Sequence, residues 1–246
     1  MKKLLIYGAT ALISFSVFLV LYAPAGIAFR FVKDDVARIP DTMVYRVGGT
    51  VWGGTADIQY RDFPASMLHW KLAALPLLKG LASLHVSMSG LGHELAGQLT
   101  TDGQNSQLST LNGFVNSDYI DQVSAQYGLR ISGTFAVNEV GLTVENDWFT
   151  AIEGDLSWTG GQVLYQVTNG SQAINLPALT GKLAIEDRQL TLNVQHNRLP
   201  VLSIFLGQDG WVRLKFYSQL FVLADLPLPE GTNTLEVVLT YEEKIL

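Results

Sequence analysis

The chain contains no cysteine and few charged residues, and both shortages narrow what it can be. Without cysteine, its 246 residues can form no disulfide, thiolate zinc site or iron–sulfur cluster. Charged residues make up 15% of the chain, against about 25% in typical domains. Hydrophobic residues make up 48%, which argues against a disordered chain. The formal net charge of -6 has the wrong sign for neutralising a phosphate backbone, so nucleic-acid binding is not expected.

Motifs that carry catalysis or bind cofactors are also lacking. The four histidines are His69, His85, His93 and His196. They show neither an i, i+4 pair nor the HExxH spacing of a zinc site. Gly90-Leu91-Gly92-His93 lacks the third glycine of a dinucleotide loop, and no G-x-S-x-G element is present. We therefore predict no catalytic residue, no cofactor-binding residue and no metal ligand, and a protein that is not an enzyme.

The one long hydrophobic run lies at the N-terminus. Residues 4–29 carry no charge and exceed the roughly 20 residues that a helix needs to cross a bilayer, and Lys2 and Lys3 precede them. Basic residues flanking a span remain in the cytoplasm. The sequence thus predicts a cytoplasmic stub over residues 1–3, a transmembrane helix acting as a signal anchor over residues 4–29, and an exported domain over residues 30–246. The alternative is a cleaved signal peptide, because Ala23-Pro24-Ala25 resembles a small-residue cleavage site.

Most of the remaining chain alternates between apolar and polar residues with a period of two. The clearest segments are 81–89, 129–137, 142–147, 152–158, 189–194 and 235–241. This alternation predicts strands with one buried face and one solvated face, which is typical of antiparallel sheets. Short helices are expected only at 117–128, opened by Ser117 and closed by Gly128, and near 75–79. The predicted fold is mainly β, a curved antiparallel sheet with a few short helices.

Two tryptophan–glycine elements suggest that the domain has two similar halves. Residues 49–54 read Gly-Thr-Val-Trp-Gly-Gly and residues 158–161 read Trp-Thr-Gly-Gly, and each leads into an alternating strand. The alternative is that both are ordinary hairpin corners. Apolar positions change from odd to even numbers at Gly48-Gly49, which predicts a bulge or sharp bend there.

The order of these elements resembles protein N of the bacterial type II secretion system. The matching pieces are residues 49–56, the Trp-x-Leu segment around Trp70, a Leu-Leu-Lys-Gly turn at 77–80 and the later Trp158 element. The motif residues to which we assign a structural role are Gly49, Trp52, Gly53, Gly54, Trp70, Trp158, Gly160 and Gly161. The resemblance implies a single-pass inner-membrane protein with a β-rich periplasmic domain, accessory to the export of folded proteins across the outer membrane. It implies as partners the other components of the inner-membrane platform and the secretin.

A second function is compatible with the predicted fold. A curved antiparallel sheet with an apolar concave face can hold an acyl chain, so a periplasmic lipid-binding protein is the alternative hypothesis. The choice depends on whether the short helices near Leu75 and Tyr119 cover the concave face. If they cover it, the interior is a packed core; if they do not, the face needs a partner.

Overall fold

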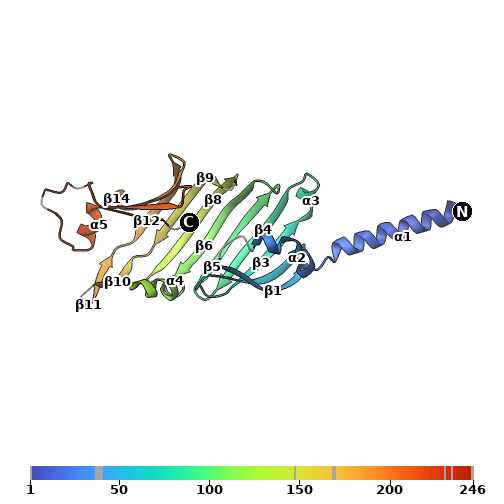
Figure 1. The fold of residues 1–246 in the computed structure, drawn as a ribbon, viewed down its shortest axis with the longest axis horizontal. Helices are drawn as coiled ribbons and strands as arrows, with labels where there is room; N and C mark the ends of the chain where they lie inside the picture. Colours follow the sequence, from blue (N-terminus) through green and yellow to red (C-terminus); the bar gives the residue numbers. More distant parts are fainter. Residues whose placement is uncertain are drawn as a thin grey trace.

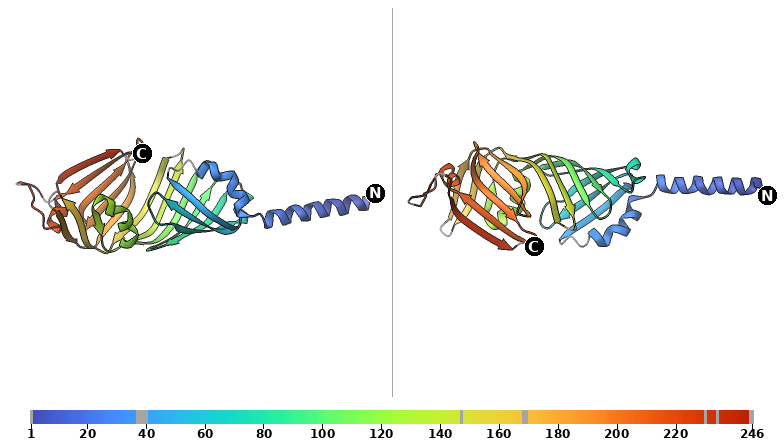
Figure 2. Two further views of the ribbon diagram at one scale, coloured as in Figure 1. Left: turned by 60° about the horizontal axis from the view of Figure 1, so that its bottom comes forward. Right: turned by 90° about the horizontal axis from the view of Figure 1, so that it is seen from above.

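The computed structural model describes residues 2–36, 41–146, 148–167, 170–229, 231–233 and 235–244. The molecule is elongated, with an N-terminal helix projecting from one end of a long sheet (Figure 1). The sheet twists and curls along its length, so that one of its faces is concave (Figure 2). The chain runs through the sheet almost in sequence order, which places the C-terminal strands at the end opposite the helix.

The main sheet contains 13 strands in the described part of the chain, and all its neighbouring strands are antiparallel. In spatial order they are β1 (Thr42–Thr50), β2 (Gly53–Tyr60), β3 (Ser66–Ala73), β4 (Ala82–Gly90), β5 (His93–Thr101), β6 (Ser106–Asn116), β8 (Thr134–Glu145), β9 (Trp148–Trp158), β12 (Leu179–Glu186), β13 (Gln189–His196), β14 (Leu199–Leu206), β15 (Trp211–Tyr217) and β16 (Val237–Lys244). The prediction of a mainly β, curved antiparallel fold is therefore confirmed.

A second, three-stranded sheet continues the middle of the first. Its strands are β7 (Leu129–Ile131), β10 (Gly161–Val167) and β11 (Gly170–Leu176), in the order β11-β10-β7. Two residues each separate β7 from β8, β9 from β10 and β11 from β12, and the order in the small sheet matches β12-β9-β8 in the large one. The small sheet is thus the bent continuation of three central strands. The prediction of one strand over 129–137 is wrong, because the chain bends at Ser132-Gly133 and the two pieces join different sheets.

Within the residues that the structure describes, three short helices connect strands. They are α3 (Ala74–Leu77), α4 (Ser117–Ser124) and α5 (Ser218–Leu223). The residue that caps the N-terminus of α4 is Asn116 and not the predicted Ser117. The Asn116 side chain accepts a hydrogen bond from the Tyr119 N–H at 3.4 Å. A single 3₁₀ turn follows and ends at Gly128, whose φ of 70° is the left-handed conformation expected at a helix end. The predicted helix near 75–79 is only the single turn of α3.

The turn between β5 and β6 is held by one carboxylate. Asp102 accepts the backbone N–H groups of Asn105 at 2.7 Å and Gln104 at 2.8 Å. These bonds stabilise the charged form and hold the pKa of Asp102 below its ordinary value, Asn105 contributing most. The side chain of Asn105 adds a third, weaker contact to the same carboxylate.

The N-terminal run folds as two helices instead of one. α1 (Lys2–Leu21) and α2 (Ala25–Val36) are separated where Pro24 bridges to Thr50 of β1. A residue that precedes proline disfavours the helical conformation, which explains the break. The prediction of one helix over 4–29 is therefore wrong. Within the described residues, no helix combines the length and the hydropathy needed to cross a membrane, so the predicted transmembrane helix is not confirmed.

The protein has a thin core. The accessible surface of the whole chain, with its projecting N-terminal helix, is 16203 Å², whereas a compact protein of this mass exposes about 10,800 Å². Among the described residues, the buried hydrophobic ones are Ala25, Ala56, Val140, Trp158, Val201 and Ala224. The alternating strands do have one apolar face, but over most of the sheet no second layer packs against it. Leu75 of α3 is 78% exposed, so the helix near it does not cover the concave face.

Candidate functional site: an apolar groove at the C-terminal end

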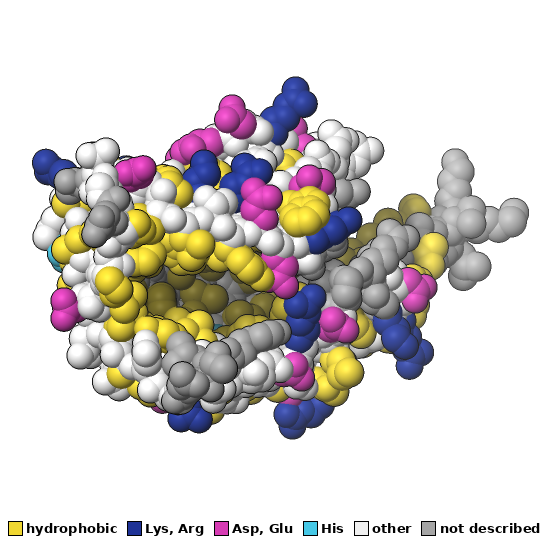
Figure 3. Space-filling model, turned by 60° about the vertical axis from the view of Figure 1, so that its left-hand side comes forward, with side chains coloured by type: hydrophobic (Ala, Val, Ile, Leu, Met, Phe, Trp, Pro, Cys, Tyr) yellow, Lys and Arg dark blue, Asp and Glu magenta, His cyan; other side chains and the backbone are white. Residues whose placement is uncertain are grey.

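An apolar space lies between the two sheets at the C-terminal end of the molecule. We call it the C-terminal groove; it is lined by residues from β7 to β15 and by Leu220 of α5, and its volume is about 500 Å³. Figure 3 shows a hollow lined by hydrophobic side chains at this end of the molecule. This volume falls within the range of about 300–1,000 Å³ that is usual for ligand sites.

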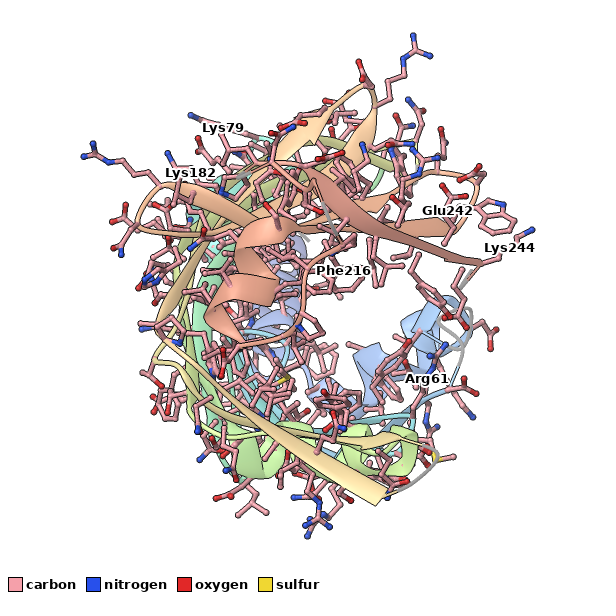
Figure 4. All side chains as sticks on the ribbon, turned by 90° about the vertical axis from the view of Figure 1, so that its left-hand side faces the viewer. Arg61, Lys79, Lys182, Phe216, Glu242 and Lys244 are labelled. Carbon is pink, nitrogen blue, oxygen red and sulfur yellow. The ribbon has the colours of Figure 1, made fainter. Side chains whose placement is uncertain are left out.

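One wall of the groove is built by the register of the large sheet. A single row of directly paired residues crosses β9, β12, β13, β14, β15 and β16, and it consists of Leu156, Gly181, Val194, Leu202, Phe216 and Leu239. The row contains no polar side chain. Phe216 points into the concave side, whereas Lys182 and Lys79 point away from it (Figure 4). The Leu192 side chain occupies the space beside Gly181, where a Cβ would lie only 2.8 Å from it.

The small sheet forms the opposite wall. Its pairing places Ile131, Val163 and Ile174 in one row across β7, β10 and β11, and all three line the groove. α5 adds Leu220, which follows Phe216 by four residues in the chain. In the small sheet only the middle strand, β10, is paired with strands on both sides, whereas β7 and β11 are its edges.

The chemistry of the lining is restricted to apolar contact. No charged residue lines the groove, and its only polar side chains with hydroxyl groups are Ser157 and Thr180. Thr180 already donates to the Gln195 carbonyl at 3.5 Å. Across the described part of the chain, no three histidine or acidic side chains come together as a metal site would require. The groove offers neither acid–base chemistry nor ion coordination, and can only receive an apolar group.

The second tryptophan–glycine element forms the corner between the two walls. Trp158 is 7% exposed and stacks on Phe135, with ring centroids 5.8 Å apart. Its Nε1 donates to the Ser132 carbonyl at 3.0 Å. Gly160 has a φ of +79°, and a Cβ at this position would lie 2.6 Å from the carbonyl carbon of Pro177. A Cβ on Gly161, the last residue of the element, would likewise lie 2.5 Å from Ser132. The bend therefore requires glycine.

The first element forms the hairpin between β1 and β2. Gly49 has a φ of +88° and pairs directly with Gly54, and a Cβ on Gly49 would lie 2.6 Å from the Gly53 carbonyl oxygen. The register of β1 shifts between Tyr45 and Gly48, so that one extra residue bulges out of this strand. The predicted irregularity is present, just before Gly48-Gly49. Trp70 packs against Gly54, where a Cβ would lie 2.5 Å from its ring, and donates to the Val51 carbonyl at 3.3 Å.

This hairpin also holds the N-terminal segment. Trp52 Nε1 donates to the Val20 carbonyl at 2.8 Å, and the Val51 N–H donates to the Ala23 carbonyl at 2.9 Å. Trp52 therefore caps the end of α1, whereas Trp158 lies at the bend where β9 of the large sheet continues as β10 of the small sheet. The two elements occupy different kinds of position, and a single continuous sheet runs through both parts of the chain. In the described part of the chain the two elements therefore do not mark equivalent positions, and the two similar halves suggested by the sequence stay a prediction.

Sequence reasoning found part of the groove, since the predicted segments 129–137, 152–158 and 189–194 all contribute to its lining. It placed Leu156, Leu192 and Val194 on apolar strand faces, but singled out neither Phe216 nor Leu220. A signal was present, because the segment of β15 alternates apolar and polar residues from Val212 to Phe216. The sequence did not show that β12 is the strand paired with β9, because β10 and β11 lie between these two strands in the chain.

Comparison with known proteins supplies the family. The family model for type II secretion system protein N matches residues 43–222. This chain belongs to the type II secretion system protein N family. The match runs from β1 to α5 and so includes both tryptophan–glycine elements and the groove. The family resemblance noted from the sequence is thus confirmed, and the protein is a component of type II secretion. Neither a curated protein nor a solved structure matches the chain significantly.

Proposed function

We propose that this member of the protein N family is a non-enzymatic accessory or assembly subunit of the inner-membrane platform, supporting the export of folded periplasmic proteins across the outer membrane. The observation that carries the proposal is the family match over almost the whole sheet domain. The groove fits a non-catalytic role, because its lining holds no histidine, lysine or carboxylate that could activate the hydroxyls of Ser157 and Thr180.

We propose further that the N-terminal segment keeps the protein at the inner membrane, as a single-pass anchor with its N-terminus in the cytoplasm and the sheet domain in the periplasm. The side chains of Phe15, Phe18 and Leu19 on α1 are between 54% and 58% exposed. Such a run of exposed apolar residues needs a non-aqueous partner. Lys2 and Lys3 precede it and support the cytoplasmic position of the N-terminus.

The topology is tested by fusing alkaline phosphatase after Arg30. The fusion should be active, and N-terminal sequencing of the membrane fraction should find the original N-terminus. Resistance of the protein to carbonate extraction would support the anchor. Recovery of a soluble periplasmic form that begins at Gly26 would show instead that the segment is a cleaved signal peptide.

The secretion role is tested by deletion of the gene and complementation. We expect the extracellular amount of a folded exoprotein to fall, with the protein accumulating in the periplasm, and the wild-type gene to restore export. Cross-linking in intact envelopes followed by affinity purification should recover other platform components or the secretin. Undiminished secretion by the deletion strain, with an unchanged amount of assembled platform, would refute the proposal.

A further inference from the structure

We propose that the connection between β3 and β4 is a membrane-docking loop, which inserts leucine side chains into the surface of the lipid bilayer beside the end of α1. We call this connection the α3 loop; it covers residues 74–81 and includes α3. The inference rests on the proposed membrane anchor and goes beyond it, because it gives the sheet domain a second contact with the bilayer.

The α3 loop exposes more apolar surface than a connection between two strands requires. An antiparallel hairpin can turn with two residues, whereas this connection has eight. Four of them are leucines: Leu75 is 78% exposed, Leu77 38%, Leu78 85% and Leu81 37%. Every residue of α3 is at least partly exposed, so the turn does not pack its side chains into the sheet. Such a cluster of exposed leucines needs a non-aqueous partner.

The loop lies next to the point where α1 reaches the sheet. The Leu72 N–H donates to the Trp52 carbonyl at 2.8 Å, and Trp52 Nε1 donates to the Val20 carbonyl near the end of α1. α3 begins at Ala74, two residues after Leu72, and two extended residues span about 7 Å. Figures 1 and 2 show α3 at the end of the sheet from which α1 projects. A bilayer that contains α1 therefore has its surface beside the loop.

The length of α1 sets the level of that surface. Its 20 residues rise about 30 Å, which is the thickness of the hydrocarbon core of a bilayer. Val20 then lies where the hydrocarbon meets the headgroups, and Trp52, which donates to it, is of a residue type that is common at this boundary. Apolar side chains of an interfacial segment penetrate about 5–10 Å at this level. The leucines of the α3 loop are placed to do the same.

The backbone of the loop is suited to contact with lipid. The N–H groups of residues 78–81 donate to carbonyl groups within the same loop, at distances between 2.9 and 3.2 Å. Backbone groups that leave water without a partner would oppose insertion. Because these four donors are already paired, the leucines can enter the bilayer surface without that cost.

The charge around the loop also favours a lipid surface. The chain has a formal net charge of -6, yet residues 63–93 contain Lys71 and Lys79 and no aspartate or glutamate. Lys79 directly follows Leu78, so its ammonium group can remain among the lipid phosphates while the leucine enters the acyl region. The anchor keeps this surface at the bilayer at all times. These observations together select the bilayer, and not a protein, as the occupant.

The test uses the full-length protein, whose lack of cysteine allows one labelling site to be introduced at a time. The variants Leu78→Cys, Leu91→Cys and Phe15→Cys are each labelled with the fluorophore NBD and reconstituted into vesicles of phosphatidylethanolamine and phosphatidylglycerol. Leu91 is the matched control, because it is 62% exposed and follows the far end of β4, about 30 Å from the loop. Phe15 reports whether α1 is inserted. Phospholipids that carry a doxyl group then quench any fluorophore within the bilayer.

We expect the doxyl lipids to quench the fluorophore at positions 78 and 15 and to leave the fluorophore at position 91 unquenched. Quenching at position 15 without quenching at position 78 would overturn the docking loop and leave the anchor standing. Absence of quenching at position 15 would overturn the anchor and, with it, the docking loop. Equal quenching at positions 78 and 91 would overturn the inference in favour of adsorption of the whole domain.

A charged variant gives an independent arm. Leu75→Asp, made in the protein labelled at position 78, places a carboxylate in the loop, and Leu91→Asp in the same labelled protein adds that charge at the control site. Both side chains are exposed, so neither change removes packing from the core, and thermal melting checks that both variants fold. Leu75→Asp should remove most of the quenching at position 78, whereas Leu91→Asp should leave it unchanged. Equal quenching in the two folded variants would contradict the inference.

Discussion

Gly49 offers a sharp test of how the first tryptophan–glycine element is built. Its φ of +88° is almost matched by the φ of +76° at Gly80, the residue that follows the turn after α3. The surroundings differ. A Cβ on Gly49 would lie 2.6 Å from both the Gly53 oxygen and the Gly54 Cα, whereas a Cβ on Gly80 would meet no atom within 4 Å. Alanine at the two positions therefore separates backbone strain from steric overlap.

The expected magnitudes follow from this difference. Gly80→Ala should lower the free energy of unfolding by about 1–2 kcal/mol, the cost of a left-handed conformation for a residue with a Cβ. Gly49→Ala should add a cost of about 1–3 kcal/mol, because the atoms in contact are backbone of the paired strand and cannot move without disturbing the hairpin. The total of about 2–5 kcal/mol is a large fraction of the 5–15 kcal/mol that usually stabilises a domain.

Urea denaturation followed by tryptophan fluorescence measures both variants. The hairpin also binds the N-terminal segment through Val51 and Trp52, so hydrogen exchange at the Val51 amide should accelerate in Gly49→Ala and not in Gly80→Ala. Equal losses of stability in the two variants would refute the predicted steric overlap at Gly49, since only the backbone strain of a positive φ, which both positions share, would then lower stability. An unchanged exchange rate at Val51 would show that the hairpin does not hold the segment.

Three further outcomes are expected. Trp158→Phe should lower the free energy of unfolding by about 1–3 kcal/mol, because the Ser132 carbonyl loses its donor at the corner; thermal melting measures this, and an unchanged midpoint would contradict it. Trp52→Phe removes the donor to the Val20 carbonyl and should speed proteolysis between α1 and α2 with little effect on the melting of the sheet; equal cleavage rates would count against this role. Folding lowers the pKa of Asp102, so the Asp102 carboxylate stabilises the fold fully above its ordinary pKa and loses this effect as the pH falls through the pKa of the folded state. The stability of Asp102→Asn should therefore depend less on acid pH than that of the wild type. Parallel pH profiles of the two proteins would exclude this contribution.

The strands could be predicted because the alternation of apolar and polar residues in a strand is visible in consecutive positions of the sequence. Leu84, Val86 and Met88 alternate with polar residues, and they do lie on one face of β4. The positions of the glycine elements were also readable, since a bend or bulge reverses the alternation locally. The long uncharged run over 4–29 indicated helix, but hydropathy does not report the break at Pro24, which is completed by a bridge to Thr50 in a distant strand.

By itself, the sequence determined the strand-rich class, the antiparallel pattern, the sharp turns and the family, because each depends on residues close together in the chain. Tertiary structure alone decided the groove. Leu156 pairs with Gly181 only because β9 and β12 are neighbours in space, although two strands of the small sheet separate them in the chain. Alternation shows that a strand has an apolar face, but what covers that face depends on elements far away in sequence. Here the small sheet and α5 cover part of it and leave a cavity, and no local pattern in the chain encodes that result.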